Sequence, residues 1–172
     1  KGRNVGTNSS YLVNLLSYDA AALPSPLTVR IENSVINGIA GSRSGEVLRV
    51  YGSSPASVSS VQILGSDLGH AGTLMNTNHP VHIEDATLHD FSDLRSADSP
   101  LFEVVHSTIE NGSRVINYGY YSGFYSFLST RFLHMDTVFN YQLEQNLSAR
   151  LEVVGCEFDD VDVAFHFNYY YY

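Results

Sequence analysis

The chain has 172 residues and a formal net charge of -9, with 18 acidic side chains against 9 Lys and Arg. The length suffices for one domain with a substantial core, and a hydrophobic fraction of 44% is ordinary for a globular protein. A single Lys and eight Arg form no basic stripe, so nucleic-acid binding is disfavoured. An acidic surface also repels anionic polymers unless a metal ion or a local Arg cluster intervenes. No run approaches the roughly 18 apolar residues that a membrane span requires.

Many short strands separated by turns are expected, because Gly, Ser, Asn and Asp recur throughout the chain. We expect one domain over residues 1–172. Since the chain starts at Lys1 without Met or a signal peptide, we expect a fragment or C-terminal domain of a longer protein. Cys156, the only cysteine, is expected to be a small buried residue rather than a reactive thiol.

A repeat runs along the chain from residue 29 to residue 158. Six segments of eight residues share one pattern without a gap: 29–36, 61–68, 81–88, 102–109, 125–132 and 151–158. Each ends on an apolar anchor. The anchors are Ile36, Leu68, Leu88, Ile109, Phe132 and Phe158, spaced by 32, 20, 21, 23 and 26 residues. This spacing is typical of coils joined by loops of variable length.

Each position of the repeat predicts a direction for its side chain. Seven and five residues before the anchor the side chain is large and apolar, and this alternation places both on the inner face of a strand, with the residue between them pointing outward. Three residues before the anchor stand turn-forming types, so a bend is expected there. These bend residues are Asn33, Gly65, Asp85, His106, Ser129 and Gly155.

Two residues before the anchor the side chain is small in every copy, which predicts a ladder of stacked inward side chains beside the bend. The ladder consists of Ser34, Ser66, Ala86, Ser107, Thr130 and Cys156. Two residues after the anchor a second set of turn-forming types stands at Gly38, His70, Asp90, Asn111, His134 and Asp160. A second apolar group follows, as in residues 47–50, 115–118, 138–141 and 163–167. Each coil therefore offers two or three strands.

The pattern predicts an all-β fold, a right-handed parallel β-helix of about six to seven coils. Leucine-rich repeats need a shorter unit and propellers a longer one. An antiparallel sandwich stays open as an alternative, because strand and turn signals do not reveal parallel pairing. The ladder of small residues favours the β-helix, since stacking of equivalent positions explains a register kept from copy to copy.

Residues 102–141 also resemble a known family. The stretches His106–Asn111, Val115–Tyr121 and Leu128–Phe132 are similar to the later coils of polysaccharide lyase family six, which includes chondroitinase B and the alginate lyases. The resemblance implies β-elimination in uronate-containing chains, a Ca²⁺ ion that neutralises the uronate carboxylate, a Lys base and an Arg near the leaving oxygen. Lys1 lies outside every coil, so the Lys role has no counterpart in the repeat. We expect a segment without a complete catalytic site, and no catalytic residue is assigned.

An aromatic run between two arginines is the candidate carbohydrate site. Tyr rings stack on sugar faces, Tyr hydroxyls bond sugar oxygens, and Arg binds carboxylates with two parallel hydrogen bonds. The predicted carbohydrate-binding residues are Tyr118, Tyr120, Tyr121, Arg114 and Arg131.

Two other groups of polar residues are interpreted as structural. The cluster of His82, Glu84, Asp85, His89, Asp90 and Asp93 includes ligand types that a hard cation accepts, but Asp85 and Asp90 fit turn positions of the repeat. No metal site is therefore assigned within the chain. Glu103 and Glu152 share an outward position, and at about 4.8 Å per coil they lie about 10 Å apart, too far for a glycosidase pair.

The leading functional hypothesis is a non-catalytic β-helical part of a polysaccharide lyase-like protein. The expected partner is an acidic polysaccharide or oligosaccharide of the alginate or glycosaminoglycan type. Neither nucleic acid nor a membrane is expected as a partner. The expected location of the protein is secreted or periplasmic. The alternative is a structural or adhesive β-helix, such as a phage tailspike stem or surface adhesin, acting as a trimer. A complete single-domain lyase ranks third because lysine is missing from the coils.

Overall fold

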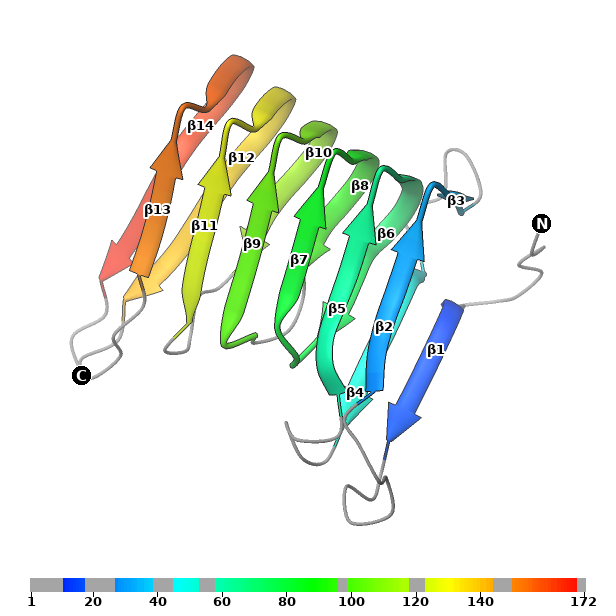
Figure 1. Cartoon of the computed structure of the whole chain (residues 1–172). Coiled ribbons are helices and arrows are strands. Elements are labelled where there is room, and N and C mark those ends of the chain that lie inside the picture. The colour runs from blue at the N-terminus through cyan, green and yellow to red at the C-terminus, as the bar shows by residue number, and fades with distance from the viewer. Residues whose placement is uncertain are drawn as a thin grey trace.

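Two parallel β-sheets wind into a right-handed solenoid in the computed structural model (Figure 1). The structure describes residues 11–17, 27–38, 45–52, 58–95, 99–117, 123–143 and 150–169. One sheet, sheet B, contains six strands in the order β13-β11-β9-β7-β5-β2. The other, sheet A, contains eight strands in the order β1-β4-β6-β8-β10-β12-β14, with β3 also paired to β6. The predicted parallel β-helix is confirmed.

Sheet B collects the first strand of each coil. Its strands are β2 (Leu27–Glu32), β5 (Val58–Leu64), β7 (Val81–Glu84), β9 (Leu101–Val105), β11 (Phe124–Leu128) and β13 (Arg150–Val154). Sheet A contains β1 (Tyr11–Ser17), β3 (Val35–Asn37), β4 (Glu46–Gly52), β6 (Asp67–Thr77), β8 (Thr87–Arg95), β10 (Thr108–Asn117), β12 (Arg131–Leu143) and β14 (Glu157–Tyr169).

The number of enclosed coils is smaller than predicted. Four coils, β5–β6, β7–β8, β9–β10 and β11–β12, have a neighbouring strand on both sides in both sheets. The coils that contain β2 and β13 stand at the ends of sheet B and are covered on one side only. The solenoid therefore has about four complete turns rather than six to seven. The predicted number includes every copy of the repeat, even a copy that has a neighbouring coil on one side only.

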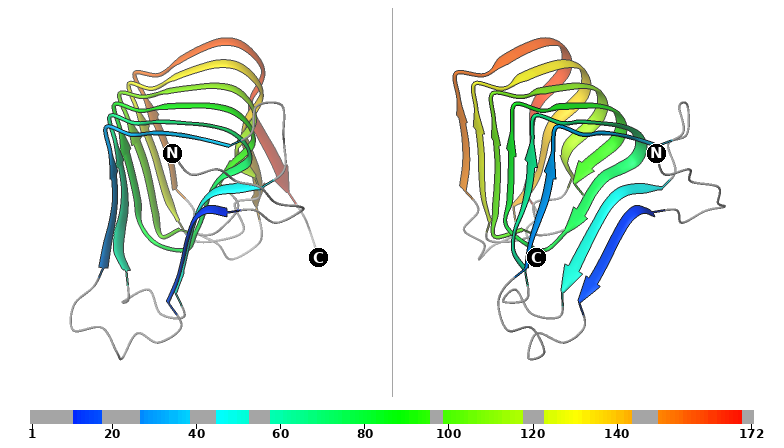
Figure 2. Two further views of the ribbon diagram at one scale, coloured as in Figure 1. Left: turned by 90° about the vertical axis from the view of Figure 1, so that its right-hand side faces the viewer. Right: turned by 45° about the vertical axis from the view of Figure 1, so that its right-hand side comes forward.

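Both predicted bends are left-handed corners. All six bend residues before the anchor have positive φ, between 48° and 65°. After the anchor, five of the six predicted residues also have positive φ, between 51° and 55°, and Gly38 is the exception. Asn, Asp and His tolerate this backbone region better than other non-Gly residues, which explains the composition of both corners. The coil outline with its stacked corners is visible along the axis in Figure 2.

Backbone hydrogen bonds between coils continue on both sides of the first corner. The corner residue donates to the coil that follows, as Asp85 N does to Val105 O at 3.2 Å. Two residues later the direction reverses, and Thr87 N donates to Ser66 O in the preceding coil at 2.9 Å. The left-handed residue therefore turns the chain without leaving the ladder of inter-coil bonds.

The small residues beside this corner form the predicted inward ladder. Ser66, Ala86, Ser107 and Thr130 are at most 3% exposed. Ser107 Oγ donates to Val105 O in its own coil at 2.8 Å and accepts from Ala86 N in the preceding coil at 3.1 Å. Ser66 Oγ makes the matching pair of bonds with Leu64 O and Ser34 N. The hydroxyl at this position thus connects one coil to the next.

The core changes character along the axis. In the earlier coils it is aliphatic, with Val61, Ile63, Val81 and Ile83 at most 1% exposed. In the later coils it is aromatic, and the ring of Phe132 lies 4.9 to 5.7 Å from three other phenylalanine rings, measured between centroids. The predicted inward positions of sheet B are confirmed. One predicted outward residue, Ser126, is only 2% exposed, in a column between the longer side chains of Glu103 and Glu152.

We predict that Ser107→Ala lowers the free energy of unfolding by about 1–3 kcal/mol, because Ala86 N loses its buried acceptor and Val105 O keeps only the bond from Asp85 N. Urea denaturation followed by circular dichroism measures the change. Ser107→Thr is the matched control, since it keeps the hydroxyl and Thr130 already occupies the same column fully buried. Equal stability of the Ala variant and the wild type would show that the ladder hydroxyls do not stabilise the stack.

Candidate functional site

The structure separates the two predicted sugar-binding arginines. Arg131 opens β12 and pairs with Thr108, whereas Arg114 pairs with Thr137, so the second corner lies between them. Each guanidinium is bound by a carboxylate: Arg131 Nε lies 2.8 Å from Glu157 Oε2, and Arg114 Nε lies 2.9 Å from Asp93 Oδ1. Tyr118, Tyr120 and Tyr121 lie outside the described residues.

A different arginine, Arg95 at the end of β8, is buried. It is 4% exposed, and its guanidinium carbon lies 5.0 Å from the ring centroid of Tyr125 and 5.6 Å from that of Phe102. Its Nε and one terminal nitrogen are buried without a hydrogen-bond partner, and no carboxylate of the described residues forms an ion pair with it. A buried guanidinium is stable only when an anion or acceptors satisfy its donors, so Arg95 is a candidate anion-binding residue.

The sequence contains a signal for Arg95 outside the predicted carbohydrate site. Its register partners are Met75 and Ile116, and Ile116 pairs in turn with Phe139. Arg95 is thus the one charged residue in a column of large apolar side chains between Met75 and Phe139. Comparing the coils beyond the second corner would have identified this exception.

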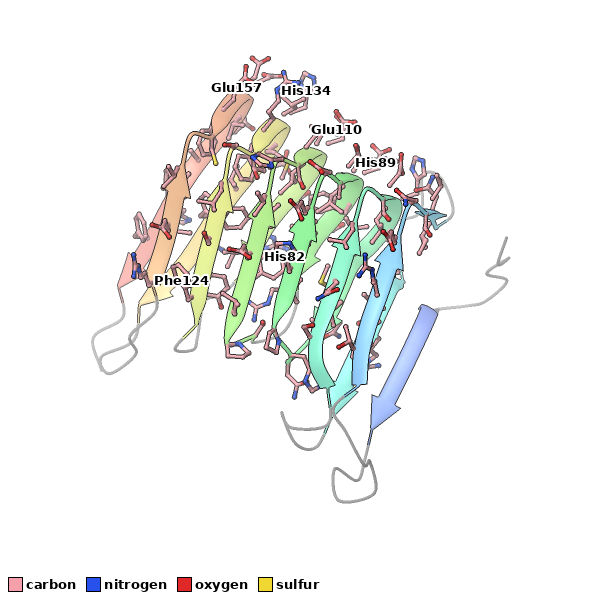
Figure 3. The ribbon with its side chains drawn as sticks, viewed as in Figure 1. His82, His89, Glu110, Phe124, His134 and Glu157 are labelled. Carbon is pink, nitrogen blue, oxygen red and sulfur yellow. The ribbon has the colours of Figure 1, made fainter. Side chains whose placement is uncertain are left out.

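A second candidate site lies on the corner ridge. We define this ridge as the outward-pointing side chains of the segments that run from the first corner to the second, residues 67–70, 87–90, 108–111, 131–134 and 157–160. Figure 3 shows His89, Glu110, His134 and Glu157 following this edge from coil to coil. His70 Nδ1 lies 3.1 Å from Asp90 Oδ2, and His89 Nδ1 lies 2.9 Å from the same oxygen. The two imidazole rings meet edge to face with centroids 4.9 Å apart.

His89 is held from both sides by carboxylates. Its Nε2 lies 2.9 Å from Asp67 Oδ1 while its Nδ1 contacts Asp90. Burial opposes the charged imidazolium, but the hydrogen bonds to Asp90 and Asp67 outweigh it, and the pKa of His89 is raised above its ordinary value. A doubly protonated ring donates to both carboxylates at once.

Only part of the acidic and histidine cluster noted in the sequence comes together. His89 and Asp90 meet on the corner ridge, where they are joined by His70 from the preceding coil. His82 lies instead on the outer face of sheet B, 2.7 Å from Glu103 and 3.3 Å from Glu84. Asp93 binds Arg114. The repeat contained the signal for His70, because His70 and Asp90 occupy the same position after their anchors.

Three further residues stay structural in this geometry. Cys156 is half-buried in the ladder, and burial raises the pKa of its thiol, which disfavours the reactive thiolate. Glu103 and Glu152 are separated by strand β11, where Ser126 pairs with both.

The donor atoms on the ridge do not match the calcium ion that the family resemblance implies. Ca²⁺ takes six to eight oxygen ligands. Within the described part of the chain, the group of side chains close enough to share an ion contains two imidazoles and one carboxylate. No chemical step through calcium is therefore derived.

Comparisons with known proteins return no matching family model, no matching curated protein and no matching solved structure. The parallel β-helix is thus supported by the structure, whereas the likeness to polysaccharide lyase family six rests on the repeat alone. The described residues also contain no helix with the length and apolarity that crossing a membrane demands.

We predict a raised pKa for His134, which lies on the ridge 2.8 Å from Asp160. The hydrogen bond to Asp160 is the main cause, and the charges of Asp160, Asp159 and Glu110 add to it. Because the folded pKa exceeds the unfolded one, the resulting stability is present below the unfolded pKa and is lost as pH rises through the folded pKa.

Nuclear magnetic resonance titration of the imidazole protons measures this pKa. Asp160→Asn is expected to move the His134 pKa back toward 6.5, whereas Asp159→Asn, which removes a charge but no hydrogen bond to His134, changes it less. An unchanged pKa in Asp160→Asn would contradict the assignment.

Proposed function

We propose that this chain is a non-catalytic, carbohydrate-binding β-helix of a polysaccharide lyase-like protein, and that its ligand is a uronate-containing oligosaccharide. The observation that supports the proposal is the buried guanidinium of Arg95 with unpaired N–H groups. A carboxylate is the anion that the planar fork of Arg binds best among sugar substituents. A uronate supplies that carboxylate on a sugar ring.

The surroundings of Arg95 fix its position in advance. The rings of Tyr125 and Phe102 lie within cation–π distance of the guanidinium. A donor group that is already ordered loses little side-chain entropy when it binds. Arg95 is therefore prepared for an anion, and no carboxylate of the described residues holds it in place.

The predicted sugar-binding tyrosines lie in the sequence between two strands that contact Arg95. The connecting segment joins β10 to β11 and includes Tyr118, Tyr120 and Tyr121. Its two flanking strands both reach Arg95: Ile116 of β10 is its register partner, and Tyr125 of β11 packs on the guanidinium. A sugar whose carboxylate binds Arg95 would therefore bind next to the strands that lead into and out of the tyrosine segment.

The net charge sets the mode of binding. At -9 the protein gains nothing from general attraction of a polyanion, so recognition has to be local. The family's Lys base has no counterpart in the coils, so this segment binds the polysaccharide while elimination belongs to another part of the protein. A secreted or periplasmic location follows from such a substrate.

Isothermal titration calorimetry with alginate and chondroitin oligosaccharides tests the proposal. We expect Arg95→Met to reduce the affinity at least about tenfold, the loss of one charge-assisted hydrogen-bond pair. Arg30→Gln, which alters an exposed arginine on sheet B, should bind as the wild type does. Arg95→Met should also keep or raise the melting temperature, because it removes a buried charge that no carboxylate of the described residues pairs with.

Three results would overturn this function. The first is absence of binding to either oligosaccharide by the wild type. The second is equal affinity in Arg95→Met. The third is formation of unsaturated uronate by the chain alone, detected by its absorbance, because it would show that the segment is catalytic.

The structural or adhesive alternative has its own supporting observation at the last coil. Strands β13 and β14 end their sheets, and apolar side chains are exposed there: Val154 by 53%, Phe165 by 44% and Phe167 by 57%. Open strand edges with apolar side chains favour association.

Under the structural alternative we predict a trimer in size-exclusion chromatography with light scattering. Phe167→Asp would dissociate it by placing a charge in the contact, whereas Arg30→Gln, on β2 at the opposite end of sheet B from β13, would leave it intact. A monomer at all concentrations would reject the alternative and leave the binding function as the simpler account.

A further inference from the structure

We propose that His70, His89 and Asp90 form a binding site for a transition-metal dication of the Zn²⁺ type on the corner ridge. The Nδ1 atoms of both histidines approach Asp90 Oδ2 at 3.1 and 2.9 Å, and all three donor atoms lie within 4.8 Å of one another. Ligands of a tetrahedral Zn²⁺ at 2.0 to 2.2 Å are separated by about 3.3 Å. The two contacts to Asp90 need to lengthen by a few tenths of an ångström, and the imidazole nitrogens, at most 4.8 Å apart, need to approach each other by at most about 1.5 Å.

The composition of the group selects the kind of metal. Two imidazole nitrogens and one carboxylate oxygen suit Zn²⁺ and its neighbours, whereas Ca²⁺ and Mg²⁺ require oxygen ligands. Three protein ligands leave a position open. The side chains of His70 and Asp90 are 29% and 40% exposed, so a water molecule or a small ligand can complete the shell from solvent.

Asp67 provides the outer support that metal-bound histidines usually have. Its carboxylate lies 2.9 Å from His89 Nε2, on the side of the ring away from Asp90. A carboxylate in this place keeps the proton on Nε2, leaves the Nδ1 lone pair for the metal and raises the basicity of the ring. The same carboxylate adds a negative charge that favours a bound dication.

The backbone around the group is shaped to hold it. His70 and Asp90 both occupy the left-handed second corner, with φ of 55° and 51°, so their side chains leave the chain in the same direction in adjacent coils. Gly69 provides the space for His89. A Cβ at residue 69 would lie 2.4 to 2.6 Å from three atoms of the His89 ring. Any other residue at this position would displace the imidazole.

Binding to the tag-free chain, measured by calorimetry with Zn²⁺ and by visible absorption with Co²⁺, tests the proposal. We expect one ion per chain and the absorption of a tetrahedral Co²⁺ centre. His70→Asn should lower the affinity for Zn²⁺ at least about tenfold, and Asp67→Asn by about 10–100-fold through the loss of outer support. Asn preserves the corner at residue 70, since Asn111 occupies the same position with φ of 53°.

His134→Asn is the matched control. His134 stands at the same corner position and pairs with Asp160, but among the described residues no second imidazole joins that pair within ligand distance. Its affinity for Zn²⁺ should equal that of the wild type. Circular dichroism melting of each variant establishes that it is folded, and Asp90→Asn replaces His70→Asn if the latter is not.

The proposal is overturned if the wild type shows no saturable binding of Zn²⁺. It is also overturned if the folded His70→Asn or Asp90→Asn variant binds Zn²⁺ as the wild type does, or if His134→Asn loses as much affinity as they do. None of these results depends on sugar binding at Arg95, so the two proposals succeed or fail separately.

Discussion

The in-register stacking of coils at two left-handed corners is the constraint on which the rest of this structure depends. A non-Gly residue in the left-handed region costs roughly 1–2 kcal/mol. The two corners together contain eleven residues in this region, and nine of the eleven are not glycine. The cost is offset because inter-coil backbone bonds continue on both sides of the first corner and the small ladder residues close the space beside it. Without this register, equivalent positions would not meet and the columns of the core would not form.

The same constraint explains where the chemistry of this protein lies. Positive φ selects Asn, Asp, His and Ser when Gly is not used, so the corners collect carboxylates and imidazoles. Stacking then brings those side chains together at the spacing of neighbouring strands, about 4.8 Å. The cluster of His70, His89 and Asp90 and the pair of His134 and Asp160 are both results of this arrangement. Corner residues chosen for their backbone conformation become potential ligands because a neighbour in the next coil is always close.

The repeat made the fold predictable, and its local nature set the limit of the prediction. The first corner, the ladder and the inward positions of sheet B follow from residue types within eight-residue segments, and all were confirmed. Beyond the second corner the segments have different lengths, so the sequence did not show that Arg114 and Arg131 are separated or that Arg95 stands in an apolar column. The burial of Ser126 was also missed, because it depends on the size of side chains in neighbouring coils. The family resemblance used the same inward, outward and turn positions that any β-helix needs, and such positions do not identify a family.

The two proposed sites are exceptions to the repeat, and this gives them a common physical meaning. Arg95 replaces an apolar residue in the core column, and Gly69 removes a side chain where the other coils have Asn37, His89, Glu110, Leu133 or Asp159. Both lie on or beside β8, with Arg95 five residues after Asp90, a separation of about 17 Å along an extended strand. A single sugar cannot span that distance, so an ion on the corner ridge would not neutralise the carboxylate that binds Arg95. An acidic protein that binds a uronate chain therefore has to offset repulsion with separate cationic groups, and Arg95 is the one that the core keeps buried beside aromatic rings.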